Sequence, residues 1–563
     1  MVRRFFSLLH QETRGLHEAA YLLGAFSVCS QLLALLRDRL LAYHFGAGTT
    51  LDIYYAAFRI PDFIFVSVAS LVSLYVLIPF LSESAYATSQ ARREFLSGIF
   101  SFFGLVIVAV SALAFVAVPK LLPLLVPGLA HTEGMESLVL LTRILLLQPM
   151  LLGISNIVAS VTQTYGRFIL YAVSPILYNV GIIVGILWLY PRFGIVGLGF
   201  GVVLGALLHL LIQLPFLSAQ GLLPYPRVFF GRELGRVLRL SLPRAFTLSA
   251  NQIALLLLTG LASLMAAGSI AVFNFSFNLQ AVPLTIIGLS YSVAAFPTLA
   301  RLFSSGEKKM FSAHILTATR HIIFWSLPAT VLFIVLRAQI VRVILGSGHF
   351  DWADTRITAA ALALFSISLV AQALVLLFVR GYYAAGDTRT PLLVNGICSA
   401  LIIAFALLFT HLFQQVPGWQ FFFEALLRVE DLPGTAILML PLSYSLASLL
   451  NAAAFFILFG RTFGRFSGSL WRAIFQSLSG AVLMGFVAYE FLEIFGHLFN
   501  INRFWGIFGQ GAIAGLLGVL AGAGILHLLG NTEIREVSES LHRRFWRAKT
   551  IVPESPDPST SAS

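Results

Sequence analysis

Hydrophobic residues occur along this chain in long runs that are separated by short polar stretches. A run of about 20 apolar residues is long enough to cross a bilayer as a helix. The pattern therefore predicts an all-α polytopic membrane protein with about 14 transmembrane helices, although Pro283 and Gly381 interrupt two of the runs. The predicted spans are 18–44, 53–82, 96–119, 137–161, 168–190, 194–218, 240–266, 268–302, 314–337, 357–384, 390–412, 436–460, 471–495 and 504–529.

Lys and Arg residues are distributed unevenly between the two sides that these spans define. With a cytoplasmic N-terminus, 24 of them fall in cytoplasmic segments and 7 in outer segments. Basic residues are retained on the cytoplasmic side, so we expect both termini there. The polar end IVPESPDPSTSAS predicts a partly disordered tail. We expect no removable signal peptide, because no short apolar run with a cleavage site follows MVRRFF.

Two pairs of short matches indicate a weak internal repeat. SPILYN (174–179) and TPLLVN (390–395) lie 216 residues apart, and IPFLSE (78–83) and FPTLAR (296–301) lie 218 apart. This offset covers six spans, which predicts two six-helix bundles in a parallel repeat with a cargo site between them near the midplane. The expected domains are a cytoplasmic N-terminal segment (1–17), a first six-helix bundle (18–218), a cytoplasmic linker (219–239), a second six-helix bundle (240–460), two additional helices (461–530) and a cytoplasmic tail (531–563).

Composition excludes a soluble protein. The chain is 58% hydrophobic and 11% charged, with a mean hydropathy of +0.90, whereas soluble domains are about 45–50% apolar and about 25% charged. The net charge of +12 is explained by basic cytoplasmic loops beside anionic lipid, so we expect membrane lipids and no nucleic acid as partners. Cys29 and Cys398 lie in apolar runs and are interpreted as small core residues.

The stretch LLRDRLLAYHFGAG (35–48) places three charged residues inside an apolar run. Arg37 lies about 12 Å from the end of its span, where an isolated Arg costs at least about 2.5–3.5 kcal/mol. Arg37 and Arg39 point to opposite faces of the helix. Two interpretations remain open. Arg37 pairs with a carboxylate such as Asp38, Asp52 or Asp62 and joins helices, or it faces a hydrated cavity and binds an anion such as phosphate.

The next span has the same character. LDIYYAAFRIPD (51–62) puts Asp52 at its entrance and Arg59 and Asp62 one turn apart, while Pro61 predicts a kink. Kinked helices at membrane depth are tolerated where they line a cavity. Arg244 begins the span at 240–266 and either extends to the interface or faces the cavity.

Other polar residues in the spans favour structural roles. Asn179 and Asn395 are typical of hydrogen bonds between helices, and His209 is typical of a packed core histidine. The Gly-rich run 194–206 favours close helix packing. The segment 413–435 can form an amphipathic helix on the outer surface. The chain has no HExxH, CxxC or Walker pattern and no large outer domain, so we expect a protein that is not an enzyme.

Two stretches resemble one protein family. RDRLLAYHFGAGTTLDIYYAAFRIPD (37–62) resembles the opening of the lipid II flippases called MurJ or MviN, in which an Arg-Asp pair, Phe-Gly-Ala-Gly, an Asp and a basic residue near a proline occur at this spacing. RGYYAAGDTRTP (380–391) resembles a second family motif at a cytoplasmic junction of two spans. The resemblance runs over essentially the whole chain.

The resemblance implies a member of the multidrug/oligosaccharidyl-lipid/polysaccharide exporter superfamily. Such a protein moves undecaprenyl-pyrophosphate-linked peptidoglycan precursor from the inner to the outer leaflet of the bacterial cell membrane by alternating access. It needs no cofactor and is driven by a Na⁺ or H⁺ gradient or by the membrane potential. The resemblance also implies a role in cell-wall biogenesis and a monomeric protein. Whether the protein contacts the cell-wall synthesis machinery stays open.

The family's cavity arginines match Gln31, Phe65 and Asn278 here, and a usual acidic residue matches Ala281, which leaves the cargo open. We assign substrate binding to Arg37, the principal phosphate contact, and to Arg59, Arg244 and Asn278. We assign gating or orienting roles to Asp38, Asp52, Asp62, Arg380 and Asp387. The alternatives are an exporter of another polyprenyl-linked oligosaccharide, a drug/cation antiporter of the same superfamily, and a scaffold or degenerate membrane enzyme that transports nothing.

Overall fold

The computed structural model describes residues 16–69, 88–165, 167–227, 232–464, 468–500 and 503–536. Within these ranges every regular element is a helix and none is a strand, which confirms the predicted all-α class. The helices of the first half are α2 (Leu16–Phe45), α3 (Thr49–Ala57), α4 (Arg59–Ala69), α6 (Ser89–Leu125), α7 (Gly134–Leu145), α8 (Leu147–Thr164), α9 (Phe168–Val184), α10 (Tyr190–Phe193), α11 (Ile195–Leu211), α12 (Leu214–Ala219) and α13 (Arg232–Ser263). Those of the second half are α14 (Ser269–Pro283), α15 (Ser290–Ser304), α16 (Lys308–Val335), α17 (Arg337–Ile344), α18 (Trp352–Ser366), α19 (Leu369–Ala384), α20 (Arg389–Gln415), α21 (Pro417–Leu427), α22 (Met439–Phe463), α23 (Gly468–Gly496) and α24 (Phe504–Leu528).

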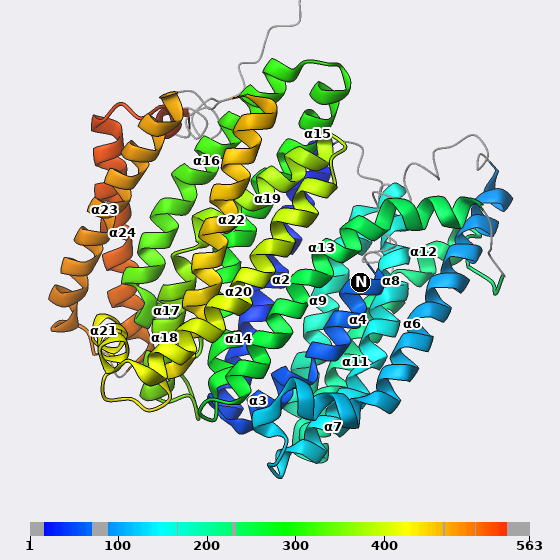
Figure 1. Cartoon of the computed structure of the whole chain (residues 1–563), viewed down its shortest axis with the longest axis horizontal. Helices are drawn as coiled ribbons and strands as arrows, with labels where there is room; N and C mark the ends of the chain where they lie inside the picture. Colours follow the sequence, from blue (N-terminus) through cyan, green and yellow to red (C-terminus); the bar gives the residue numbers. More distant parts are fainter. Residues whose placement is uncertain are drawn as a thin grey trace, which may run out of the picture.

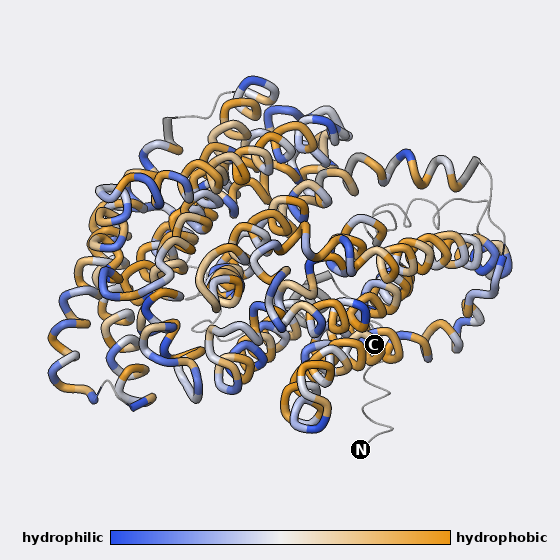
Figure 2. Tube along the Cα trace, turned by 60° about the horizontal axis from the view of Figure 1, so that its bottom comes forward, coloured by the Kyte–Doolittle hydropathy of each residue, from blue (hydrophilic) through white to orange (hydrophobic). Residues whose placement is uncertain are grey.

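The described residues contain 10 helical segments that are long and apolar enough to cross a membrane, or 11 if the bent pair α18 and α19 is one span. They correspond to eleven of the predicted spans. The other three predicted spans match α2, α3 with α4, and α13, and residues 70–82 lie outside the described ranges. Figure 2 shows apolar residues along most of the helix lengths. The protein is therefore polytopic, while the number 14 stays a prediction.

The helices form two groups that meet at one end of the molecule (Figure 1). The first group contains α2 to α12, and the second contains α14 to α24. Helix α13 lies between them and packs on both α4 and α20, while α2 packs along α9. We call the lower end in Figure 1 the α3 end and the opposite end, where α15 lies, the α15 end. The predicted domain boundaries and the repeat stay predictions.

Proline positions explain two of the irregularities in these helices. The chain bends at Phe58, between α3 and α4, because Pro61 has no N–H to donate to the carbonyl four residues earlier. Pro283 is followed by a π-helical turn, Leu284–Leu289, that leads into α15. The prediction for Gly381 was wrong. It lies inside the continuous helix α19 against Phe459, and the 44° bend falls between α18 and α19 instead.

Glycines allow α9 and α11 to approach closely. A Cβ added at Gly201 would lie 2.4 Å from the Cα of Gly185, and one at Gly181 would lie 2.3 Å from the Cα of Gly205. Any larger residue would force the two backbones apart, which confirms that the run 194–206 serves helix packing.

The segment 413–435 contains α21, as the amphipathic pattern predicts. Phe421, Phe422 and Leu426 are exposed on this helix, while Phe423 and Glu424 are buried. The expectation for the cysteines was half right, because Cys398 is buried and Cys29 is exposed.

Candidate functional site

The carboxylate of Asp52 binds the beginning of α14. Its two oxygens accept hydrogen bonds from the backbone N–H groups of Gly268 (2.6 Å) and Ala271 (2.9 Å). The first N–H groups of a helix have no partner within the helix and carry partial positive charge. Gly268 stands at the N-cap of α14 and has no side chain to satisfy them. Asp52, which is buried on α3, therefore supplies from the first group the cap that α14 lacks.

Gly268 makes this approach possible. Its φ of +88° is a conformation that side-chain-bearing residues rarely adopt, and a Cβ there would lie 1.9 Å from the backbone oxygen of Ala47. Position 268, in the short loop between α13 and α14, must therefore be glycine. This brings the loop after α2 against the start of α14.

One turn further along α14, Asn274 contacts Arg59 of α4. The Nη2 of Arg59 donates to the amide oxygen of Asn274 (2.7 Å), and the Asn274 amide nitrogen donates to the backbone oxygen of Ile270 (2.7 Å). Arg59 is half-buried. Within the part of the chain that the structure describes, its buried Nε and the hydroxyl of Tyr55 have no hydrogen-bond partner. The Nε of Arg59 therefore has no acceptor among the described residues in this conformation.

A second turn along, Asn278 contacts Asp38 of α2. The Asn278 amide nitrogen donates to Oδ2 of Asp38 (3.1 Å). The other oxygen of Asp38 accepts from Nε (2.9 Å) and Nη2 (2.8 Å) of Arg37. The Nη1 of Arg37 donates to Asn179 of α9 (3.2 Å). The first interpretation of Arg37 thus holds for this conformation, since it pairs with Asp38 and joins α2 to α9.

We call the three contacts of α14 with Asp52, Arg59 and Asp38 the contact ladder. The α14 residues involved, from Gly268 to Asn278, span about 15 Å along the helix at 1.5 Å per residue. The ladder therefore runs from the α3 end towards mid-depth. Arg37 keeps 19% of its side chain exposed beside it, against 4% for Asp38, so it is not sealed among the helices.

Further contacts join the two groups at the α3 end. The N–H of His349 donates to the backbone oxygen of Tyr43 (3.0 Å), and the N–H of Ala47 donates to the carboxylate of Asp354 (3.0 Å). At the same end, the N–H of Gly128, after α6, donates to the hydroxyl of Ser263 in the last turn of α13, the helix between the two groups (3.1 Å). This end of the molecule is therefore closed.

The remaining predicted residues lie elsewhere. Asp62 of α4 accepts a hydrogen bond from Gln148 of α8 (3.3 Å). This contact lies within the first group. The backbone of Arg244 belongs to α13, but its side chain lies outside the described part of the structure.

Arg380 and Asp387 are not brought to the ladder. Arg380 donates to Ser292 and to the backbone oxygen of Leu289 (3.2 Å). Asp387 accepts from the backbone N–H groups of Arg389 (2.9 Å) and Thr390 (3.0 Å) at the start of α20. Partial burial raises the pKa of Asp387, but a hydrogen bond from the Thr390 hydroxyl (2.6 Å), together with these backbone hydrogen bonds, outweighs it and holds the pKa below its ordinary value. Both residues therefore fix helix ends towards the α15 end.

Sequence reasoning missed Asn274, Gln148 and Tyr55. The spacing of Asn274 and Asn278, four residues apart in an apolar run, was a usable signal because it places both amides on one face of a helix. The predicted helix-joining roles of Asn179 and Asn395 agree with the structure, where Asn395 accepts from Asn451 of α22 (3.0 Å). Among the described residues, no group of three or more His, Cys, Asp or Glu side chains could hold a metal ion.

Comparison with known proteins identifies the family. The model of the family described as "Lipid II flippase MurJ" matches residues 41–417. A "Probable lipid II flippase MurJ" of Haemophilus influenzae is 29% identical over 404 residues, which is 68% of this chain and 78% of that protein. A "Lipid II flippase MurJ" of Burkholderia cenocepacia is 25% identical over 390 residues, which is 67% of this chain and 75% of that protein.

A solved structure shares the fold. It is described as "Lipid II flippase MurJ, inward closed conformation", superimposes with a TM-score of 0.71 at 21% identity, and covers 92% of this chain and 100% of its own. Because the family match covers well over half of the sequence, this chain belongs to the lipid II flippase MurJ family.

Proposed function

We propose that this protein moves lipid II, the lipid-linked peptidoglycan precursor, from the cytoplasmic to the outer leaflet of the bacterial inner membrane by alternating access. Family membership supports the cargo and the reaction. The excess of basic residues, 24 against 7, supports an orientation in which the α3 end faces outward and both termini are cytoplasmic.

The closed α3 end supports a cytoplasm-loading state for this conformation. The contact ladder, the Tyr43–His349 contact and the Ala47–Asp354 contact all join the two groups at the proposed outer side. Cargo then enters from the cytoplasmic side, and these contacts have to break before the head group can leave outward.

A single observation carries the binding site, namely the unpartnered Nε of the half-buried Arg59. A buried donor without an acceptor is unfavourable by about 1–3 kcal/mol, so an incoming acceptor is favoured there. A guanidinium can bind two phosphate oxygens at once. Arg37 is already neutralised by Asp38 at 2.8 Å. We therefore propose Arg59 as the principal contact of the cargo diphosphate, with Arg37 in a supporting role.

Binding at Arg59 also provides a link to the outer closure. Arg59 currently donates to the neutral amide of Asn274, and a charged acceptor forms a hydrogen bond about twice as strong as a neutral one. A diphosphate oxygen is thus expected to replace the Asn274 oxygen. This exchange removes the middle contact of the ladder and weakens the closure at the α3 end.

The test is a flipping assay with purified protein in proteoliposomes that contain fluorescent lipid II. Arg59→Gln removes the cation and is expected to lower the flipping rate about 10- to 100-fold, because hydrogen bonds to charged groups contribute about 1.5–3 kcal/mol. Arg59→Lys, which lacks the planar fork, should lose most of that activity as well.

Arg143→Gln is the matched control, since Arg143 also lies in a membrane-spanning segment but contacts the backbone of Phe115 away from the ladder. Wild-type flipping by Arg59→Gln would refute the site. A parallel assay with a polyprenyl diphosphate oligosaccharide that lacks the peptide tests the cargo. Faster transport of that lipid than of lipid II would favour the alternative of a different lipid-linked glycan.

A further inference from the structure

Arg39 joins α2 to two helices of the second group without taking part in the contact ladder. Its Nη1 donates to the backbone oxygens of Val343 (2.5 Å) and Ile344 (3.3 Å), in the last turn of α17. Its guanidinium carbon lies 5.3 Å from the centre of the Phe504 ring, the first residue of α24. One cation of the first group therefore contacts both α17 and α24.

Both contacts are favourable for a positive charge. The last carbonyl groups of a helix have no partner within the helix and carry partial negative charge. An aromatic face attracts a guanidinium electrostatically. Because α2 packs along α9 in the first group, both contacts must break when the two groups separate at the α3 end.

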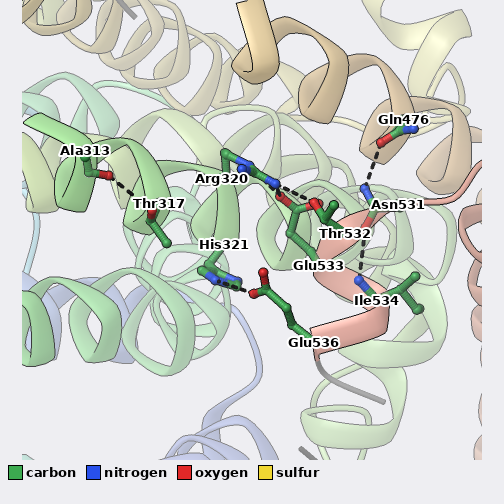
Figure 3. Close-up of polar contacts among 10 residues, drawn as sticks. All are labelled: Ala313, Thr317, Arg320, His321, Gln476, Asn531, Thr532, Glu533, Ile534 and Glu536. Atoms are coloured by element: carbon green, nitrogen blue, oxygen red, sulfur yellow. Dashed lines mark hydrogen bonds and ion pairs between the residues drawn. The ribbon is translucent and has the colours of Figure 1, made fainter. Parts of the chain in front are cut away.

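The opposite end of the α23–α24 pair is anchored to α16 (Figure 3). Arg320 of α16 pairs with Glu533 (2.6 Å) and also donates to Thr532. The next residue of α16 is His321, whose Nε2 lies 3.3 Å from a carboxylate oxygen of Glu536. The side chain of Glu533 is only 2% exposed. Removal of the Glu533 charge would leave Arg320 without its buried partner, which is strongly destabilising. The contact therefore holds α16 firmly to the end of the α23–α24 pair.

The anchor extends to α23. Asn531, which is fully buried after α24, donates to the side chain of Gln476 (3.2 Å), and Gln476 donates to the backbone oxygen of Leu529 (2.9 Å). Helix α24 packs along α23 and also beside α17. With 25 residues it is about 37 Å long. The pair is thus fixed to α16 at the α15 end and reaches Arg39 at the α3 end.

We propose that α23 and α24 act as a brace that holds the α3 end closed, and that Arg39 is the positioning residue through which the first group engages it. The inference rests on the proposed function in one respect, that the α3 end opens during transport. The brace stabilises the closed state selectively, because its contact with α2 is absent once the groups separate.

The experiment measures opening at the α3 end directly. Ser269 begins α14 and is 4% exposed, so a cysteine there reacts with a membrane-impermeant thiol reagent only when this end opens. Ser269→Cys is introduced with Cys29→Ser and Cys398→Ala, and the protein is reconstituted in nanodiscs. When opening and closing are fast relative to modification, the rate follows the open population. A cysteine in place of the exposed Glu430 corrects for intrinsic reactivity.

Phe504→Leu removes the ring that Arg39 contacts and is expected to raise the modification rate about two- to fivefold, the range of a partly exposed cation–π contact. Phe504→Tyr keeps the ring and should retain the wild-type rate. Trp505→Leu is the matched control, because the neighbouring Trp505 is 75% exposed. Glu533→Gln, at the other end of the brace, should raise the rate as Phe504→Leu does. If Glu533→Gln does not fold, Thr532→Val replaces it.

Equal modification rates for Phe504→Leu and Trp505→Leu would overturn the brace. A wild-type modification rate in Glu533→Gln or its replacement Thr532→Val would overturn it as well. The assay contains no cargo. Failure of the lipid II assay together with the expected labelling pattern would therefore reject the proposed cargo and leave the brace standing.

Discussion

Two amides on α14 receive the charged side chains of the first group. Asn274 accepts from Arg59, and Asn278 donates to Asp38. Neutral partners suit contacts that must form and break in every cycle, because a fully paired buried ion pair is costly to separate. The side chain of Asn278 thereby gains a structural role. It satisfies the second oxygen of Asp38, whose first oxygen is taken by Arg37.

Two substitutions at Asn274 should shift the equilibrium between the closed and open states of the α3 end in opposite directions. Asn274→Asp gives Arg59 a charged acceptor, which strengthens the middle contact of the ladder and competes with the cargo diphosphate. Asn274→Ala removes the contact. We expect slower alkylation of a cysteine at position 269 in the first variant and faster alkylation in the second, with flipping reduced in Asn274→Asp. The same direction of change in both variants would contradict the role given to this amide.

The start of α14 is capped by a different helix. Asp52 binds the N–H groups of Gly268 and Ala271, so α14 is completed only when α3 is docked against it. Closure at the α3 end and the order of the first turn of α14 are thus coupled. The π-helical turn Leu284–Leu289 at the other end of α14 adds a second irregular point, and such turns are frequent at functional positions.

Gly268→Ala is expected to destabilise the closed state strongly. The new Cβ would meet the Ala47 backbone at 1.9 Å, and the left-handed φ adds about 1–2 kcal/mol of strain. Gly306→Ala is the control, because Gly306 also has a positive φ of +79° but no atom within 4 Å of the added Cβ. Thermal unfolding in detergent should show a clearly larger fall in Tm for Gly268→Ala. Equal falls would mean that backbone strain alone, and not the close approach, accounts for the loss.

The two groups close as one unit at the α3 end. The ladder, the Tyr43–His349 and Ala47–Asp354 contacts and the proposed brace all act between them at that end. A transport cycle has to break this set together, which favours two discrete states over gradual opening. In the proposed binding mode, a diphosphate at Arg59 would remove one contact of the set and lower the barrier to opening.

A covalent link across this end should stop transport. Tyr43 and His349 are both exposed, and their backbones are in contact at 3.0 Å. Tyr43→Cys with His349→Cys, in a protein that lacks Cys29 and Cys398, can be joined by a short bifunctional thiol reagent. Flipping should be lost after linkage and return after reduction, while each single-cysteine variant treated in the same way stays active. Undiminished flipping by the linked protein would exclude alternating access at this end.

Local features of the chain were sufficient to predict the membrane class, most of the spans, the bend near Pro61 and the charged positions Arg37, Asp38, Asp52 and Arg59. Each of these depends on residues that are close in sequence, through apolar run length, helical spacing or the missing N–H of proline. The position of the bend in the span at 357–384 was not predictable in this way, because Gly381 fits inside a helix that packs against Phe459.

The partners of these charges depended on how distant helices pack. Asp52 meets Gly268 across 216 residues and Arg59 meets Asn274 across 215, and no local pattern encodes such a pairing. The folded arrangement also determines which partners the two arginines have. Arg37 is neutralised by its own neighbour Asp38, and Arg59 keeps a free donor. Sequence spacing sets where a charge lies along its helix, whereas its availability to a ligand depends on which side chains of other helices reach it first.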